Sequence, residues 1–554
     1  MTERLRFPAL CLVVLLLSLM SSRVALGSTR VRKGTQAAPQ TVSKASDFNG
    51  DGYGDLAVGV PGEDVGAATD TGAVSILYGS ATGLSATSNQ FWDETATGSA
   101  TDASGDLFGW AEATGDFNGD GFKDLAVGVP FKEVGIATDA GAVSILYGSA
   151  SGLSATGSQQ WNQDLLGTNP SETNDGFGAS VATGDVNGDG FDDLAVGVPG
   201  EGVGSIASAG AADIILGSAA GLTAAGNEDW SQNSAGVLNK SETDDEFGLS
   251  VTIGDFNGDG FGDLGVGVPL EDLVSGGSTR TDAGGVNVLY GSATGLTSTD
   301  DDFWSQDATG IVGIVESGDW FGYAIGAGDF DGNGFDDLIV GVPLEDITQI
   351  VEAGGANVIY GSSTGLSSAG NQFWDQNSTG INGKAEAGDT FAASVSAGDF
   401  DGNGFDDAAF GVPGEDVGSR TDAGAVNVIY GKASGLDSAN ADIWDQDTPN
   451  IIGVAENGDI FGASVTVADF GNGPEDDLVS GVPWEDIGSI ADAGLANVIY
   501  GSPSDLTSTG NQAWQQDTTG ILDMAEAGDE FGFGLGEPGT GNASRPLASL
   551  WPSG

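Results

Sequence analysis

The chain has 554 residues, of which 81 are acidic and 15 basic, and its formal net charge is −66. This charge repels nucleic acid and anionic membrane surfaces, so neither is expected as a partner. Histidine is absent and Cys11 is the single cysteine. Catalysis by Ser-His-Asp or Cys-His groups and zinc ligation by histidine are therefore excluded, and no disulfide framework is expected.

The N-terminal segment has the pattern of a secretory signal. Arg4 and Arg6 precede the apolar run "LCLVVLLLSLM", and "VALG" ending at Gly27 resembles a small-residue cleavage site. We interpret residues 1–27 as a signal peptide, with a retained N-terminal anchor as the alternative, and residues 28–44 as a linker with part of a first strand. No other stretch has the length and hydropathy of a membrane span. These features predict a secreted or cell-surface protein.

One motif, "GDFNGDGFKDLAVGVP" at residues 115–130, recurs along the chain. Aligned on the first aspartate of each loop, the copies begin at Asp47, Asp116, Asp185, Asp255, Asp329, Asp399 and Asp469. A tryptophan recurs with the same period of about 70 residues, and so does a Phe-Gly pair, with Phe391–Ala392 as the one variant. The chain is therefore a seven-unit internal repeat.

Each unit has the pattern of about four short β-strands. "FGASVATGD" and "DLAVGVP" alternate around the acidic loop, "GAVSILYGS" is a third strand, and the segment around "NQFWD" is a fourth. Seven such units predict an all-β fold, a seven-bladed β-propeller of four-stranded blades. A linear β-solenoid is the competing architecture, but its repeats are usually much shorter.

The two ends of the repeat complement each other. The first loop, at Asp47, has no Phe-Gly strand before it, and the last Phe-Gly, at Phe531, has no loop after it. We therefore predict that "DEFGFGLG", in a closing strand of about residues 525–536, supplies the inner strand of the first blade. The propeller then spans residues 45–536, its ring is closed by pairing of the N- and C-terminal segments, and residues 537–554 form a tail.

The acidic loop has the pattern of a calcium site. Counting from its first aspartate, the second copy places Asp116, Asn118, Asp120 and Asp124 at positions 1, 3, 5 and 9, and Phe122 at position 7 offers a backbone carbonyl. Hard oxygen donors at alternate positions, with glycine allowing the tight turn, are the ligands that Ca²⁺ prefers. Three carboxylates around one divalent cation leave a site of about −1, whereas without it they repel.

The loop has two other possible interpretations. An EF-hand needs flanking helices and a glutamate at position 12, where this copy has Val127, so that interpretation fails. An Asx-rich turn without metal is the simpler alternative, although turns alone do not require acids at alternate positions. The seventh copy, "DFGNGPEDD", has glycine at positions 3 and 5 and keeps Asp469, Asn472 and Asp477. Metal binding there is left open.

The unit "FGASVATGDVNGDGFDDLAVGVP" resembles the FG-GAP repeat of integrin α-chain propellers, and the resemblance covers roughly residues 45–536. It implies a seven-bladed propeller with calcium in hairpin loops on the lower face. Leg domains, a membrane span and a cytoplasmic tail of the integrin type are not found in this sequence, so pairing with a β-chain is not implied. The implied calcium ligands, with the carbonyl donors of position 7, are Asp47, Asn49, Asp51, Tyr53, Asp55, Asp116, Asn118, Asp120, Phe122, Asp124, Asp185, Asn187, Asp189, Phe191, Asp193, Asp255, Asn257, Asp259, Phe261, Asp263, Asp329, Asp331, Asn333, Phe335, Asp337, Asp399, Asp401, Asn403, Phe405 and Asp407.

Other repeated residues are interpreted as structural. The tryptophans are expected to pack between blades rather than to form sugar platforms, and the Phe of each Phe-Gly is expected to pack there too. The acids of "PGED", such as Glu63 and Asp64, are expected to bond to nearby backbone. The fourth unit is longer in "LEDLVSGGSTRTDAGG", a loop on the upper face, where Arg280 is a candidate for ligand contact against the alternative of a solvated loop tip.

The sequence thus predicts an exported, monomeric, calcium-binding propeller that acts as an adhesion or interaction module. Its ligand, a protein or a glycan, is expected on the face opposite the calcium loops. The alternatives are a polysaccharide hydrolase or lyase and a purely structural envelope or matrix component. We expect no enzyme, because no set of residues that breaks the repeat suggests a catalytic site.

Overall fold

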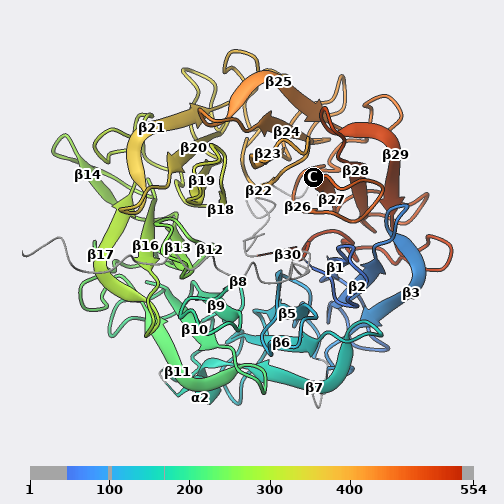
Figure 1. Ribbon diagram of the computed structural model, residues 1–554, viewed down its shortest axis with the longest axis horizontal. Helices are drawn as coiled ribbons and strands as arrows, with labels where there is room; N and C mark the ends of the chain where they lie inside the picture. Colours follow the sequence, from blue (N-terminus) through green and yellow to red (C-terminus); the bar gives the residue numbers. More distant parts are fainter. Residues whose placement is uncertain (1–45, 98–102, 168, 539–554) are drawn as a thin grey trace, which may run out of the picture. The chain divides into compact units, whose positions relative to one another are not determined.

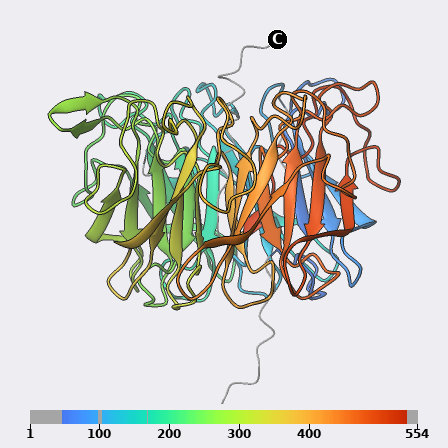
Figure 2. The same ribbon diagram turned by 90° about the horizontal axis from the view of Figure 1, so that it is seen from above.

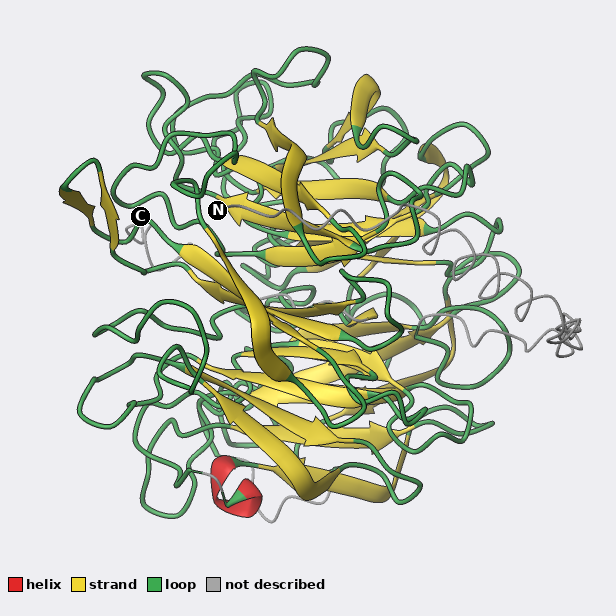
Figure 3. Ribbon diagram, turned by 60° about the vertical axis from the view of Figure 1, so that its left-hand side comes forward, coloured by secondary structure: helices red, strands yellow, loops and turns green. Residues whose placement is uncertain are grey.

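The computed structural model describes residues 46–97, 103–167 and 169–538. The predicted signal peptide and linker, and the tail beyond residue 538, lie outside these residues. The described chain is almost entirely β-structure. Its one helix in these ranges is the single turn α2 (Gln163–Leu166), as Figure 3 shows.

Seven sheets are arranged in a ring, one for each sequence repeat, which confirms the predicted seven-bladed propeller over a linear solenoid (Figure 1). Neighbouring strands within each blade are antiparallel and follow chain order. In chain order the blades consist of β1 (Leu56–Val60), β2 (Ala73–Tyr78) and β3 (Ser85–Trp92); β4 (Glu112–Gly115), β5 (Asp124–Val129), β6 (Ala142–Tyr147) and β7 (Ser154–Trp161); β8 (Ser180–Gly184), β9 (Asp193–Val198), β10 (Ala211–Leu216) and β11 (Thr223–Trp230); β12 (Val251–Gly254), β13 (Asp263–Val268), β16 (Gly285–Tyr290) and β17 (Thr297–Trp304); β18 (Ile325–Gly328), β19 (Asp337–Val342), β20 (Gly355–Tyr360) and β21 (Ser367–Trp374); β22 (Val395–Gly398), β23 (Asp407–Val412), β24 (Ala425–Tyr430) and β25 (Asp437–Trp444); and β26 (Val465–Ala468), β27 (Asp477–Val482), β28 (Leu495–Tyr500) and β29 (Thr507–Trp514).

Burial explains the strand sequences. The second and third strands of a blade, such as β5 and β6, are buried along their whole length, which requires apolar or small residues at every position. The outer strand, such as β7, is exposed or half-buried and consists mainly of polar and small residues. The strands run between the two faces of the ring, as the edge view in Figure 2 shows. Loops that join the first and second strands therefore lie on the face opposite those that join the second and third.

The ring closes as the sequence predicts. Gly59 N–H donates to the Gly534 carbonyl at 2.9 Å, and Gly532 and Gly536 donate to the carbonyls of Gly59 and Ala57 at 3.0 and 3.1 Å. The C-terminal segment thus adds an antiparallel inner strand to the three-stranded sheet of the first blade. Pairing continues in β30 (Glu537–Pro538), which runs parallel to β4 of the second blade.

Apolar side chains fill the seams, the junctions between neighbouring blades. Phe108 is fully buried between Val74 of the first blade and Leu125 of the second, and Trp92 packs against the same cluster. The expectation that the repeated tryptophan and the Phe of Phe-Gly pack between blades is thus met in this seam.

A tyrosine contact between blades was not predicted from the sequence: the Tyr78 hydroxyl accepts a hydrogen bond from Leu153 N–H of the next blade at 3.2 Å. Tyr500 makes the same contact with Leu84 and so joins the last blade to the first.

A polar contact also crosses each seam. In six seams, the amide nitrogen of a glutamine that follows the outer strand donates to the glutamate of the "PGED"-type motif in the next blade, at 2.5 to 2.8 Å. The pairs are Gln516–Glu63, Gln163–Glu201, Gln232–Glu271, Gln306–Glu345, Gln376–Glu415 and Gln446–Glu485. The expectation that these glutamates bond to backbone is therefore wrong, whereas the neighbouring Asp64 does accept from Asp70 N–H at 3.0 Å.

The seam between blades 1 and 2 uses different chemistry at the same positions. Lys132 replaces the glutamate and Glu94 replaces the glutamine, and their Nζ and Oε1 atoms are 2.6 Å apart. Asp106 lies 3.2 Å from the same ammonium. Both acids are buried, with side chains 1% and 2% exposed, so the lysine balances charge that water cannot reach.

Replacing Lys132 by methionine should therefore be costly. It leaves two buried carboxylates without their cation, and loss of one partner of a buried pair costs about 3–5 kcal/mol of unfolding free energy. Urea denaturation measures this, with Lys384→Met as the control, because that lysine is 76% exposed in its pair with Glu386. The double variant Lys132→Glu/Glu94→Gln recreates the pair of the other six seams and should recover most of the loss. A double variant no more stable than Lys132→Met would contradict this account of the seams.

Glu112 is another buried acid that breaks the repeat. It lies on β4 beside the closing strand, where the other copies have Val181, Val251, Ile325, Val395, Val465 and Leu535. It is 2% exposed, and neither carboxyl oxygen has a hydrogen-bond partner among the described residues. A Cβ on Gly59 would lie 2.5 Å from Glu112 Oε1, so the carboxyl occupies space left by glycine. Burial raises the pKa of Glu112 well above its usual range.

The raised pKa predicts a pH dependence of stability. The folded state keeps the Glu112 proton to a higher pH than the unfolded chain, so its contribution to stability is complete below the unfolded pKa and is lost as pH rises towards the folded pKa. Glu112→Val should remove this loss, and its advantage over the natural protein should grow by up to about 1.4 kcal/mol per pH unit. Urea denaturation from pH 5 to 9 at saturating calcium tests this. Parallel pH profiles for the two proteins would contradict it.

Candidate functional site

Six of the acidic loops join the first and second strands of their blades, and the one at Asp47 precedes β1, the second strand of the first blade; all seven lie on one face of the ring. We number them loops 1 to 7 in chain order, and count positions from the first aspartate of each. In loop 5, between β18 and β19, Asn333 and Gly334 N–H donate to the two oxygens of Asp329 at 3.0 and 2.9 Å. Gly332 and Gly334 have φ of 67° and 86°, a backbone conformation that favours glycine. The loop therefore curls around its first aspartate.

The aspartate at position 9 anchors the loop to the blade. Asp337 is fully buried, its Oδ2 accepts from Phe330 N–H at 3.0 Å, and its Oδ1 accepts at 2.8 Å from the N–H of Gly361, the residue that follows the third strand. Asp407 makes the same two contacts in loop 6. This residue is thus part of the fold as well as a predicted ligand.

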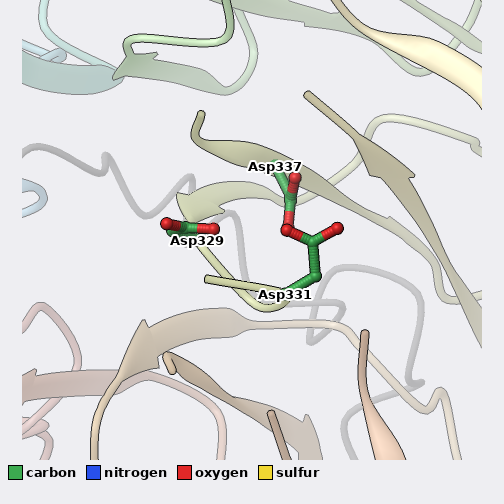
Figure 4. A group of neighbouring side chains, drawn as sticks. All are labelled: Asp329, Asp331 and Asp337. Carbon is green, nitrogen blue, oxygen red and sulfur yellow. The ribbon is translucent and has the colours of Figure 1, made fainter. Parts of the chain in front are cut away.

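Loops 5 and 6 bring three carboxylates together. One oxygen from each of Asp329, Asp331 and Asp337 lies within 4.8 Å of the other two, and Asp399, Asp401 and Asp407 repeat the arrangement. Figure 4 shows the first group at the end of its hairpin. The side chains at positions 1 and 3 are half-buried and the one at position 9 is buried.

The electrostatics of these groups favour a cation. Burial raises the pKa of Asp337 to about 8, hydrogen bonds from Gly361 and Phe330 oppose the rise, and the charges of Asp331 and Asp329 add to it. Burial likewise raises the pKa of Asp407 to about 8. A divalent cation among the three oxygens would offset this repulsion, and hard oxygen donors are the ligands that Ca²⁺ or Mg²⁺ takes. The residues present therefore fit such an ion.

Loops 1 to 4 have the same curl but place their acids differently. They carry asparagine at position 3 and aspartate at position 5, and the position-5 side chains, such as Asp189, are exposed. Asn187 Nδ2 donates to Asp193 Oδ2 at 3.2 Å, so this amide presents its nitrogen to the position-9 carboxylate. Rotating the amide would present its oxygen instead. The structure thus brings the predicted oxygen donors of these loops to one end of the hairpin without gathering three carboxylates as closely.

Loop 7 differs in shape. A Cβ on Gly471 would lie 1.8 Å from the Ser80 carbonyl oxygen, so the loop packs directly against the first blade. Asn472 has a φ of 71°, and its Nδ2 lies 3.2 Å from where a Cβ on Gly510 would be, beside the outer strand. Asp469 and Asp477 keep their places, but positions 3 and 5 bring no side-chain oxygen. This geometry weighs against a seventh site of the same kind.

The opposite face carries a cavity that the sequence reasoning missed. It has a volume of about 330 Å³ and is lined by residues of blades 2 to 4 that include Trp110, Phe131 and Leu249, with Asp139 and Asp175 among the polar ones. The rings of Trp110 and Phe131 lie 5.2 Å apart at 78°, in an edge contact. Most copies have a smaller residue than Trp110 after Phe-Gly, so aligning that position would have singled it out.

The extra residues of the fourth unit form a hairpin on the same face. Its strands β14 (Leu273–Ser275) and β15 (Ser278–Arg280) project beyond the other loops of blade 4 (Figure 2). Arg280 is at its base, and its charge lowers the pKa of Asp319, although burial leaves that pKa raised to about 7. Arg280 therefore faces acidic neighbours of its own chain, which supports a structural role alongside the predicted ligand contact.

A ring of seven blades with acidic hairpin loops on one face is the architecture that the sequence predicts for FG-GAP repeats, and the repeats are also found by comparison with known proteins. Residues 38–77, 108–146, 177–221, 247–289, 321–360 and 391–429 match the FG-GAP repeat. The chain therefore contains six FG-GAP repeats and resembles the propeller of integrin α-chains.

Individual relatives match over part of their length. Integrin alpha-V of Gallus gallus is 32% identical over 46% of this chain and 22% of its own length. Phosphatidylinositol-glycan-specific phospholipase D of Bos taurus is 36% identical over 28% of this chain and 18% of its own length. Among solved structures, the exotype rhamnogalacturonan lyase YesX covers 86% of this chain and 82% of its own, with 11% identity and a TM-score of 0.36. That score supports no functional argument. Within the described residues, no helix has the length and apolar character needed to cross a membrane.

Proposed function

We propose that this protein is an exported, calcium-stabilised FG-GAP propeller that acts as an adhesion or interaction module. One observation carries the calcium assignment. In each of loops 5 and 6, three carboxylates lie together, with one oxygen of each within 4.8 Å of the other two. Loops 1 to 4 share the loop curl and the position-9 anchor, so we assign six calcium sites and none of this kind to loop 7. A bound ion would supply positive charge where the chain concentrates negative charge.

Calcium should then determine the stability of the ring. Each site filled at one hundred times its dissociation constant adds about 2.7 kcal/mol to the unfolding free energy. Elemental analysis of the dialysed protein should find six calcium ions, and a chelator should lower the melting temperature reversibly. Asp331→Ala and Asp401→Ala should each remove one ion, whereas Asp164→Ala on α2, far along the chain from any loop, should remove none. An unchanged melting curve in chelator, or no bound ion, would contradict the assignment.

The ligand of the module is assigned to the face opposite the calcium loops. The cavity beside Trp110 supports this, because it combines apolar walls with polar groups, as binding sites for small groups of a larger partner do. Phe131 is 38% exposed and lies edge-on to Trp110, so the two rings together offer an aromatic surface to a partner. The partner class remains the one predicted, a protein or a glycan.

Similarity alone does not decide between binding and catalysis, since an integrin and a phospholipase both match the repeats. Both matches cover less than a quarter of the relative, so the relatives' activities do not transfer as wholes. We assign binding because the acids of the hairpin loops repeat from blade to blade, whereas a catalytic pair would be unique. The acids that break the repeat, Glu94, Glu112 and Asp213, are buried and do not line the cavity. Trp110 and Phe131 do line it, and their aromatic side chains carry no proton-transfer group.

The ligand surface can be tested with arrays of purified glycans and extracellular proteins. The natural protein should bind a subset of them in the presence of calcium and lose that binding in chelator. Trp110→Ala should weaken the binding at least tenfold, because a central aromatic anchor is worth about 2 kcal/mol or more. Ile136→Ala, at a fully exposed position of the same blade, is the matched control. Unchanged binding by the Trp110→Ala variant would contradict the assignment of the ligand site to this cavity.

A further inference from the structure

Each acidic loop holds its neighbour through backbone. The N–H of position 8 in one loop donates to the carbonyl of position 1 in the preceding loop, in all seven seams and at 2.7 to 3.1 Å. Lys123 to Asp47 and Asp336 to Asp255 are two examples. The position-1 residue of each loop, its first predicted ligand, is thus bonded to position 8 of the loop in the next blade. Position 8 lies between positions 7 and 9, which are predicted ligands of that next loop.

In four seams a side chain doubles this contact. The carboxylate at position 8 accepts a hydrogen bond from the N–H of position 1 in the preceding loop, at 2.7 to 3.1 Å. The pairs, position 8 first, are Asp192–Asp116, Asp336–Asp255, Asp406–Asp329 and Asp476–Asp399. In the other three seams position 8 is Gly54, Lys123 or Gly262, and this bond cannot form.

The residue at position 7 adds a third contact. A Cβ on Gly332 of loop 5 would lie 2.5 Å from the ring of Phe405 in loop 6, so the aromatic side chain lies directly on the preceding loop. Phe122, Phe191, Phe261 and Phe335 cover the equivalent glycines of the loops before them. The position-7 residue is also predicted to offer its carbonyl to the ion of its own loop. A shift of that carbonyl therefore also shifts the aromatic ring that lies on the preceding loop.

We propose that the position-8 aspartates are positioning residues that couple calcium binding in one loop to calcium binding in the next. The inference rests on the proposed function, since it needs calcium in the loops. An ion that orders positions 7 and 9 of a loop fixes position 8 between them, which holds position 1 of the preceding loop in its ligating place. The preceding loop then orders at a lower entropic cost, which is positive cooperativity.

The pattern of position 8 divides the six sites into blocks. Asp336 and Asp406 join loops 4, 5 and 6, and Asp192 joins loops 2 and 3. Lys123 and Gly262 cannot make the side-chain bond, so only the backbone contact and the aromatic ring at position 7 join loop 1 to loop 2 and loop 3 to loop 4, and the coupling there is weaker. Asp476 joins loop 6 to loop 7, which lacks side-chain oxygen ligands at positions 3 and 5. The six calcium sites should therefore fall into classes of three, two and one coupled sites. The class of three should have the steepest binding curve.

Calorimetric titration of the full-length protein with calcium chloride tests this. The natural protein should bind six ions with a Hill coefficient above 1 for the largest class. The double variant Asp336→Ala/Asp406→Ala should still bind six ions, but with a Hill coefficient near 1 and an affinity at least fivefold weaker for three of them. Asp336→Asn/Asp406→Asn keeps an oxygen that accepts the N–H bond and should retain the steepness, which separates the bond from the charge.

Two further variants complete the test. Asp476→Ala removes the same contact from a seam that joins only one site, so it should leave the steepness unchanged. Lys123→Asp introduces the contact between loops 1 and 2 and should change the classes to three and three, a gain that misfolding cannot produce. Because Lys123 Nζ also lies 2.9 Å from Asp192 Oδ2, Lys123→Ala, which removes that ion pair without adding the contact, is its control. Six ions bound with equal steepness in the natural protein and the double alanine variant would overturn the coupling alone. Absence of bound ions would overturn the calcium assignment itself.

Discussion

The structure depends on backbone N–H groups that hold like charges close together. Asp329 and Asp337 each accept hydrogen bonds from the chain around them, so their carboxylates stay within 4.8 Å of Asp331 although all three carry negative charge when ionised. Burial makes that arrangement still less favourable for the charged form. A loop built in this way is unfavourable by itself and favourable with a cation, and this is the basis on which we propose calcium for loops 5 and 6.

The seams show that one geometry can be maintained by different chemistry. Six of them use a neutral amide and a glutamate, and one uses Lys132 with Glu94 at the same positions. Both residues of the pair change together in that one copy, which indicates that the contact itself is required. The closing seam keeps the amide–glutamate pair in Gln516 and Glu63, so the ring joins its ends by the same side-chain contact that joins its interior blades.

Much of this could be predicted from the sequence, because the repeat puts the same residues in the same local setting seven times. The strands, the loop curl, the buried Phe391 and the closure by residues 532–536 all follow from patterns within one unit or from the unmatched ends. The missed contacts join residues about 40 or 70 positions apart, such as Gln163 with Glu201 and Asp406 with Asp329. Only the angle between neighbouring blades brings these together, and no periodicity within a unit reveals it. Trp110 was missed for another reason: a repeat is read for what its copies share, and this residue differs.

The most direct test of the central claim is an anomalous difference map from crystals grown with calcium. The account predicts a peak among the oxygens of positions 1, 3 and 9 in each of loops 5 and 6, further peaks in loops 1 to 4, and none in loop 7. Loops 5 and 6 with their carboxylates in place and no anomalous density between them would contradict it.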